Sequence, residues 1–103
     1  MGVLTGLSEC VELLVSELVT NSVAASQSLE RIFPVRLWLL SGRARVLILV
    51  WDANPQPPVR TVAGVEDESG RGLLLVETIS SRWDWYVSHQ GVGGKVVWAQ
   101  AEM

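Results

Sequence analysis

Two polar side chains near the start of the chain stand on a helical face that is otherwise mostly apolar. Glu17 and Asn21 are four residues apart, and this spacing stacks two side chains on the same face of a helix. Burial of a carboxylate or an amide without a hydrogen-bond partner is costly. The pair therefore either makes a structural hydrogen bond, as a helix cap or a contact between helices, or belongs to a functional site.

A third polar residue lies at the end of an apolar run. Asp52 directly follows residues 46–51, so it places one charge at the C-terminal edge of a buried strand. Such a carboxylate commonly caps the turn that follows, which here begins with Asn54 and Pro55. The same position would also suit a carboxylate that serves a binding site.

A glycine-rich segment, Gly70-Arg71-Gly72, precedes the apolar run that begins at Leu73. Glycines ahead of a helix let its free N–H groups approach a phosphate closely, and the helix dipole favours the anion. A second glycine-rich segment, residues 91–95, ends in a lysine but leads into a strand-like pattern without Ser or Thr. A phosphate-binding P-loop requires a strand, a loop and then a helix, so this second segment is not one.

Composition excludes several classes of function. The net charge is −3 and no basic run is present, so the electrostatic signature of a nucleic-acid-binding protein is missing. The five tryptophans fall in strand-like runs, which favours core packing over base stacking. Cys10 is the only cysteine, a small apolar residue on the helix rather than a disulfide or zinc ligand, and His89 has no companion metal ligands. Without a signal peptide or a bilayer-length apolar run, we expect a cytoplasmic protein with no direct contact to nucleic acid or membrane.

The elements that position these residues follow from the hydrophobic periodicity. The pattern predicts a helix from Leu7 to about Ala25 with Thr5 as its N-cap, and a short helix from Leu73 to about Ser80. It also predicts two hairpins, 35–40 with 46–51 and 83–88 with 95–99. Three prolines take 52–58 out of the sheet, and 60–72 is expected to be a loop. The order predicts one domain over residues 1–103, a two-layer α+β sandwich with helices on one face of a mixed, mostly antiparallel sheet.

Taken in order, these segments resemble the sequence boxes of the Bergerat ATP-binding fold. This is the GHKL family, which includes gyrase B, MutL, histidine kinases and anti-sigma-factor serine/threonine kinases. Residues 16–24 (SELVTNSVA) resemble the N-box, 50–59 (VWDANPQPPV) the first ATP-contact box of small actinobacterial members, 70–77 (GRGLLLVE) the glycine box, and Trp83 with 93–98 (GGKVVW) the closing hairpin. The resemblance covers nearly the whole chain.

The resemblance implies that the chain binds ATP and Mg²⁺. It gives Asn21 the role of magnesium ligand through its amide oxygen, and Glu17 the role of activating the attacking hydroxyl. Asp52 would accept a hydrogen bond from the adenine amino group, and Asn54 lies in the same ATP-contact box. The glycine box would close over the phosphates, through Gly70, Arg71, Gly72 and Leu73.

The chain departs from the family pattern at several places. Ala53, Asn54 and Pro55 stand where the wider family has glycines, and Lys95 stands where a threonine commonly supports the adenine site. Ala24 and Ala25 replace an Arg-His pair found in many small actinobacterial kinases. The strand and helix expected upstream of the N-box are missing from this sequence, and that region contributes to dimerisation in relatives.

By this resemblance the function is that of a serine/threonine kinase of the anti-sigma-factor type, acting in transcription regulation. Its expected partners are a STAS-type anti-sigma antagonist and a sigma factor, and homodimerisation is left open. The alternative is a non-catalytic or degenerate nucleotide-binding module that acts by sequestering a protein. A third interpretation, the separate catalytic domain of a histidine kinase, is less favoured because the sequence lacks a dimerisation helix with a phospho-acceptor histidine.

Overall fold

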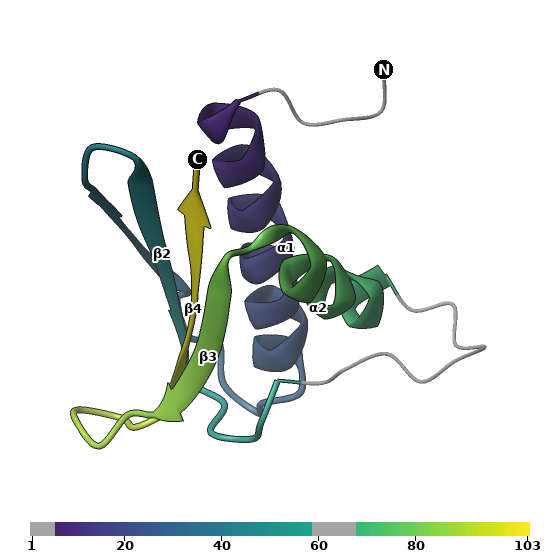
Figure 1. The fold of residues 1–103 in the computed structure, drawn as a ribbon. Helices are drawn as coiled ribbons and strands as arrows, with labels where there is room; N and C mark the ends of the chain where they lie inside the picture. The colour runs from purple at the N-terminus through teal and green to yellow at the C-terminus, as the bar shows by residue number, and fades with distance from the viewer. Residues whose placement is uncertain (1–5, 59–67) are drawn as a thin grey trace.

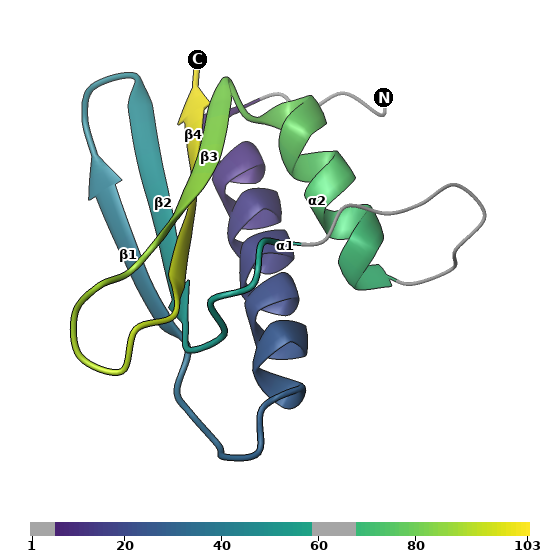
Figure 2. The ribbon, with the colours of Figure 1, turned by 90° about the horizontal axis from the view of Figure 1, so that it is seen from below.

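The computed structural model describes residues 6–58 and 68–103, and of residues 68–72 it describes the helix but not the side chains. The described elements are α1 (Leu7–Gln27), β1 (Arg36–Ser41), β2 (Arg45–Asp52), α2 (Glu68–Ile79), β3 (Arg82–Val87) and β4 (Lys95–Glu102). The described strands form one sheet in the order β1-β2-β4-β3, and every neighbouring pair is antiparallel. Both described helices lie on the same side of this sheet (Figures 1 and 2). The predicted two-layer α+β sandwich is confirmed.

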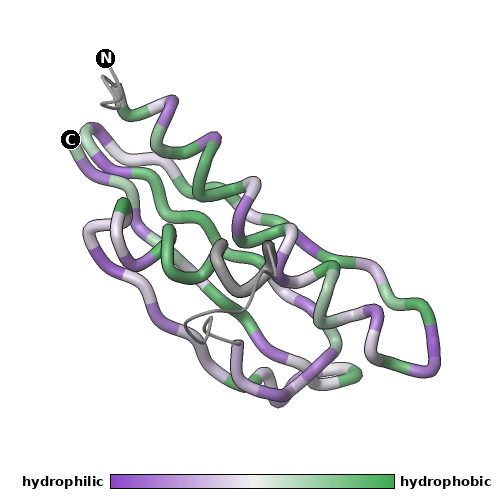
Figure 3. Tube along the Cα trace, turned by 90° about the vertical axis from the view of Figure 1, so that its right-hand side faces the viewer, coloured by the Kyte–Doolittle hydropathy of each residue, from purple (hydrophilic) through white to green (hydrophobic). Residues whose placement is uncertain are grey.

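Helix α1 forms because its apolar residues recur at helical spacing and one face can be buried. Leu14, Leu18 and Ser22 are buried on the face toward the sheet, and the tube coloured by hydropathy alternates between apolar and polar along this helix (Figure 3). The N-cap is Gly6, which makes no side-chain cap bond; the expected N-cap, Thr5, lies outside the described residues. Packing rather than capping therefore holds the start of the helix.

The two central strands carry the core. Residues alternate between the two faces of a strand, and the residues of β2 and β4 on the helix side are almost fully buried. With residues of α1 and α2 they form the main core cluster: Leu14, Leu18, Ile48, Val50, Val76, Val97, Ala99 and Ala101. Both predicted hairpins are confirmed, with β1 paired to β2 and β3 paired to β4.

Helix α2 begins earlier than the sequence pattern predicts. Residues 68–72, expected to belong to a loop, form its first turns. The two glycines there cost roughly 1 kcal/mol each relative to alanine. Burial of Leu73 and Val76, which are 2% and 0% exposed, offsets that cost, since packing of an apolar face supplies most of a helix's stability in proteins.

The face of the sheet away from the helices is only partly covered. Trp51 is 9% exposed and packs with Val96 and Phe33 in a second, smaller cluster. Trp38, on the edge strand β1, is 46% exposed, so the expectation that all the tryptophans pack in the core is wrong for this residue. Strand β1 is exposed throughout, because α1 packs on β2 and β4 instead.

Cys10 behaves as a small apolar residue of the interface between the helices. It packs against the main core cluster, and its Sγ donates a hydrogen bond to the Ile79 carbonyl at 3.6 Å. Burial raises the pKa of the Cys10 thiol above its usual range, which further favours the protonated thiol over the reactive thiolate. No helix in the described part of the chain is long and apolar enough to cross a membrane.

Candidate functional site

Asp52 continues the row of buried residues on the helix side of β2. Ile48, Val50 and Asp52 are two positions apart along the strand, so their side chains point to the same face, and all three are 0% exposed. The residue directly across the ladder is Lys95, the first residue of β4. A carboxylate and an ammonium therefore end the two central strands inside the protein, beside the C-terminal part of α1.

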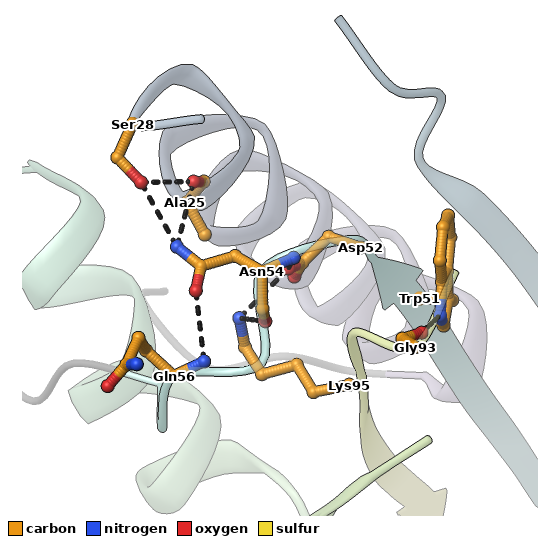
Figure 4. A network of polar contacts seen from close by, with 8 residues as sticks. All are labelled: Ala25, Ser28, Trp51, Asp52, Asn54, Gln56, Gly93 and Lys95. Atoms are coloured by element: carbon orange, nitrogen blue, oxygen red, sulfur yellow. Dashed lines mark hydrogen bonds and ion pairs between the residues drawn. The ribbon is translucent and has the colours of Figure 1, made fainter. Parts of the chain in front are cut away.

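The two oxygens of the Asp52 carboxylate have different surroundings. Oδ1 accepts a hydrogen bond from Lys95 Nζ at 2.9 Å and another from the Asn54 backbone N–H at 3.0 Å (Figure 4). Oδ2 is buried and has no hydrogen-bond partner among the described residues. Asp52 thus does cap the turn that follows it, as one interpretation of the sequence proposed, but only with one oxygen.

Asn54 ties the loop after β2 to the end of α1. Its Nδ2 donates to the Ala25 carbonyl and to Ser28 Oγ, both at 3.0 Å, and its Oδ1 accepts the Gln56 N–H at 2.9 Å (Figure 4). The Ala25 carbonyl also accepts hydrogen bonds from the N–H and the Oγ of Ser28, the C-cap residue, so Asn54 adds a contact from outside to an end of the helix that is already capped. Its side-chain amide is engaged within the protein.

Backbone contacts hold β4 close against the end of β2. Gly94 has φ +85°, and a Cβ at this position would lie 2.1 Å from the Asp52 carbonyl oxygen. Only glycine fits this approach and adopts this φ without strain. The Trp51 indole Nε1 donates to the Gly93 carbonyl at 2.8 Å. Together these contacts place Lys95 opposite Asp52.

A pocket of about 310 Å³ opens beside this ion pair. Its walls are the C-terminal part of α1, the end of β2 with the loop after it, and the start of β4, with Asn21, Ala25, Asp52, Asn54, Pro57 and Lys95 among the lining residues. The Nδ2 atom of Asn21 is buried and finds no acceptor among the described residues. Two residues that line the pocket, Asn21 and Asp52, thus each carry a buried polar atom without a partner among the described residues. Such atoms are uncommon in folded proteins unless a ligand or water completes them.

Three of the predicted site residues meet at this pocket, and others do not. Asn21, Asp52 and Asn54 line it, whereas Glu17, one helical turn before Asn21, is not among its lining residues and is half-buried. The side chain of Leu73 is buried in the core. Gly70, Arg71 and Gly72 lie in the first turns of α2, and their side-chain surroundings are outside the described residues.

Lys95 lines the pocket but is not among the site residues predicted from the sequence. Its position after two glycines suggested a phosphate loop, and once that was set aside its charge was left without a role. Two signals were available in the sequence: it is the only lysine of the chain, and it begins a strand whose next four residues are apolar. A charged residue in such a strand needs a partner if it is buried.

The two described helices cover one side of the sheet, and a buried aspartate at the end of a central strand lines a pocket beside the N-box helix. This arrangement is that of a partial Bergerat ATP-binding fold. A family model of the histidine kinase-like ATPase domain matches residues 2–101, and the chain belongs to this family. Searches of curated proteins and of solved structures give no match to the chain.

Domains of this family generally bind Mg-ATP, and the residues at the pocket fit both parts of that ligand. The free Oδ2 of Asp52 suits the amino group of adenine, since a carboxylate accepts and adenine donates. Asn21 can offer its amide oxygen, the ligand type that Mg²⁺ prefers. No three His, Cys, Asp or Glu side chains of the described residues gather as a metal site. Because Mg²⁺ is usually held by one or two protein ligands together with substrate phosphates, Asn21 would share the ion with phosphate oxygens.

Proposed function

We propose that this chain binds Mg-ATP and transfers the γ-phosphoryl group to a serine or threonine of a STAS-type anti-sigma antagonist, as a regulator of transcription. The observation that carries the proposal is the Asp52 carboxylate, which lines the pocket together with Asn21 and whose buried Oδ2 has no partner among the described residues. The family includes anti-sigma-factor serine kinases, which supports this choice of reaction. Sigma-factor binding and homodimerisation remain predictions.

Each residue has a chemical task in this proposal. Asp52 accepts the amino group of the base and orients the nucleotide. Asn21 holds the magnesium ion, which neutralises charge on the phosphates when it is bound. Glu17, one turn along the same helix, accepts the proton of the attacking hydroxyl.

The first turns of α2 would receive the phosphates. Backbone N–H groups at the start of a helix have no partner within the helix and carry partial positive charge. Gly70 and Gly72 lie in these turns and place no side chain between backbone and phosphate. Arg71 adds a positive charge to the same segment.

Binding is tested by thermal shift with ATP, with and without Mg²⁺. We expect the wild-type protein to be stabilised by ATP, more strongly with Mg²⁺, and Asn21→Ala to lose the magnesium-dependent part. Asn21 lies on the pocket wall, so Thr20→Ala, an exposed neighbour on α1, is the matched control. Equal magnesium dependence in Asn21→Ala and the wild type would remove Asn21 from the metal site.

Chemistry is tested by transfer from γ-labelled ATP to antagonist proteins of the same genome. Glu17→Gln keeps the size and polarity of the side chain but removes the base, so transfer should fall about 10²–10⁴-fold while ATP affinity is kept. A variant with wild-type transfer rates would exclude Glu17 as the base.

A second function is favoured by the position of Glu17. Because this carboxylate is not among the residues that line the pocket, the chain can also be a non-catalytic nucleotide-binding module that sequesters a protein partner. Nucleotide-dependent binding of an antagonist or sigma factor without any transfer of label would select this function over the kinase.

A further inference from the structure

We infer that Lys95 is a positioning residue that keeps the Asp52 carboxylate a hydrogen-bond acceptor only. Lys95 thereby sets the preference of the pocket for a base with an exocyclic amino group over a base with a carbonyl. The inference deepens the proposed function and rests on it. It assigns a role to a residue whose ammonium is not itself expected to touch the base.

The two oxygens of the Asp52 carboxylate differ in their hydrogen bonds because of the ion pair. Lys95 Nζ and the Asn54 N–H both donate to Oδ1, while Oδ2 receives no donor from the described residues. Rotation of the carboxylate by half a turn would exchange the two oxygens but would present the same acceptor edge. In either orientation the carboxylate offers a ligand a lone pair and no proton.

Lys95 is well held for this task. Its side chain is 3% exposed, and its Nζ also donates to the Asn54 carbonyl at 3.0 Å. The close approach of Gly94 to the Asp52 backbone fixes the distance between the two strands at this point. An ammonium only donates hydrogen bonds, so two of its three donors are committed to Asp52 and to the loop that follows.

Loss of the ammonium would change what the pocket presents. A buried carboxylate without a nearby cation is unfavourable, and such a group tends to bind a proton instead. A protonated carboxyl group both donates and accepts, so it would tolerate the carbonyl of guanine as well as the amino group of adenine. Lys95 therefore contributes to the choice of base through Asp52.

The test compares ATP and GTP binding by calorimetry, with Mg²⁺ present, in the wild type, Lys95→Met and Lys95→Arg. We expect the wild type to bind ATP more tightly than GTP. In Lys95→Met the ratio of the ATP and GTP affinities should fall about tenfold or more, whereas Lys95→Arg should keep most of this ratio because the positive charge remains. Arg45→Met is the matched control, since it removes one positive charge at the other end of the same ladder. Its ratio should equal that of the wild type.

A double variant separates positioning from general structural support. If Lys95 acts through Asp52, then Lys95→Met should leave the ATP/GTP ratio unchanged in the Asp52→Asn background. The double variant carries no buried charge at these two positions, so its ATP/GTP ratio can be measured even if Lys95→Met alone does not fold. A further change of ratio in that background would overturn the inference.

A spectroscopic signature tests the geometry without nucleotide. Since Lys95 is the only lysine, labelling with ¹⁵N-lysine gives a single side-chain ammonium signal by NMR. We expect slow exchange of its protons with water in the wild type and fast exchange in Asp52→Asn.

The nucleotide titrations separate the failure of the inference from the failure of the proposed function. If the wild type prefers ATP and Lys95→Met keeps the same ATP/GTP ratio, only the inference is overturned. Wild-type protein that binds neither nucleotide would overturn the proposed function and the inference with it.

Discussion

The ladder between β2 and β4 carries an ion pair at each end, and the two pairs differ in nearly every respect except their distance. Arg45 and Glu102 face each other at one end, 3.0 Å apart, with side chains 67% and 36% exposed. Asp52 and Lys95 face each other at the other end, 2.9 Å apart, with side chains 0% and 3% exposed. The first pair lies in solvent, and the second lies against α1 and the pocket.

The comparison shows that the same pair of charges has a different physical meaning at each end. In solvent both charges are already stabilised by water, so their contact adds little. Inside the protein each charge depends on the other, because desolvation is costly for either one alone. A buried pair is a poor way to gain stability, and this agrees with the role that we propose for it beside the pocket.

The largest expected effect is on the free energy of unfolding when one partner is removed. Lys95→Met should lower it by about 3–5 kcal/mol, because Asp52 is left buried without its cation and either keeps an unpaired charge or must take up a proton. Arg45→Met removes the same charge at the exposed end and should change it by about 0–1 kcal/mol. Urea denaturation of both variants measures the difference. Similar losses would show that the two ends are not distinct.

The glycines near the two ends offer a second contrast. Gly94→Ala places a Cβ against the Asp52 carbonyl oxygen at a positive φ, and strain with overpacking should cost about 2 kcal/mol or more. Gly42→Ala, in the turn at the exposed end, meets no atom closer than 3.8 Å and should be neutral within about 0.5 kcal/mol. Thermal denaturation compares the two, and a neutral Gly94→Ala would argue against the close approach of the strands.

The next effect concerns ligand binding. Asp52→Asn should weaken ATP binding on the order of 10–150-fold, since a hydrogen bond to a charged group contributes about 1.5–3 kcal/mol, and should recover some GTP binding because an amide can donate. Glu102→Gln makes the same chemical change at the exposed end and should alter neither affinity. Titration of both nucleotides checks this. If Asp52→Asn binds ATP like the wild type, Asp52 is only a turn cap.

The smallest effect is the response of the exposed pair to salt. A double-mutant cycle on Arg45 and Glu102 should give a coupling of under about 1 kcal/mol at low salt. The coupling should disappear at 1 M NaCl, where the screening length falls to about 3 Å. The same cycle on Asp52 and Lys95 should keep most of its coupling, because buried charges are screened much less. Loss of both couplings would mean that water reaches the buried pair.

Much of the fold could be predicted from the sequence because its signals are local. The periodicity from Leu7 gives α1, and the two apolar runs on either side of a short turn give each hairpin. The start of α2 could not be found in this way, since Gly70 and Gly72 disfavour a helix and only packing against the rest of the protein decides in its favour. The exposure of Trp38 likewise depends on which strands the helices cover.

The candidate site was predictable only in part. Asn21 and Asp52 could be selected because a polar residue at the edge of an apolar pattern needs an explanation. Their meeting at one pocket, and the pairing of Asp52 with Lys95, depend on the register between strands that lie 43 residues apart in the chain. Local patterns do not contain that register, and it follows from the antiparallel pairing of β2 with β4 and from the fit of Gly94.

Because the only lysine of the chain is buried, the rate of its chemical modification can report local opening of the protein. An amine-reactive reagent can reach the ε-amino group of Lys95 only while the end of the β2–β4 ladder is open, because the side chain is 3% exposed in the closed protein. The rate of acylation at this position, followed by mass spectrometry, would therefore report the free energy of local opening at the pocket. A ligand that binds the closed form should slow that reaction in proportion to its occupancy.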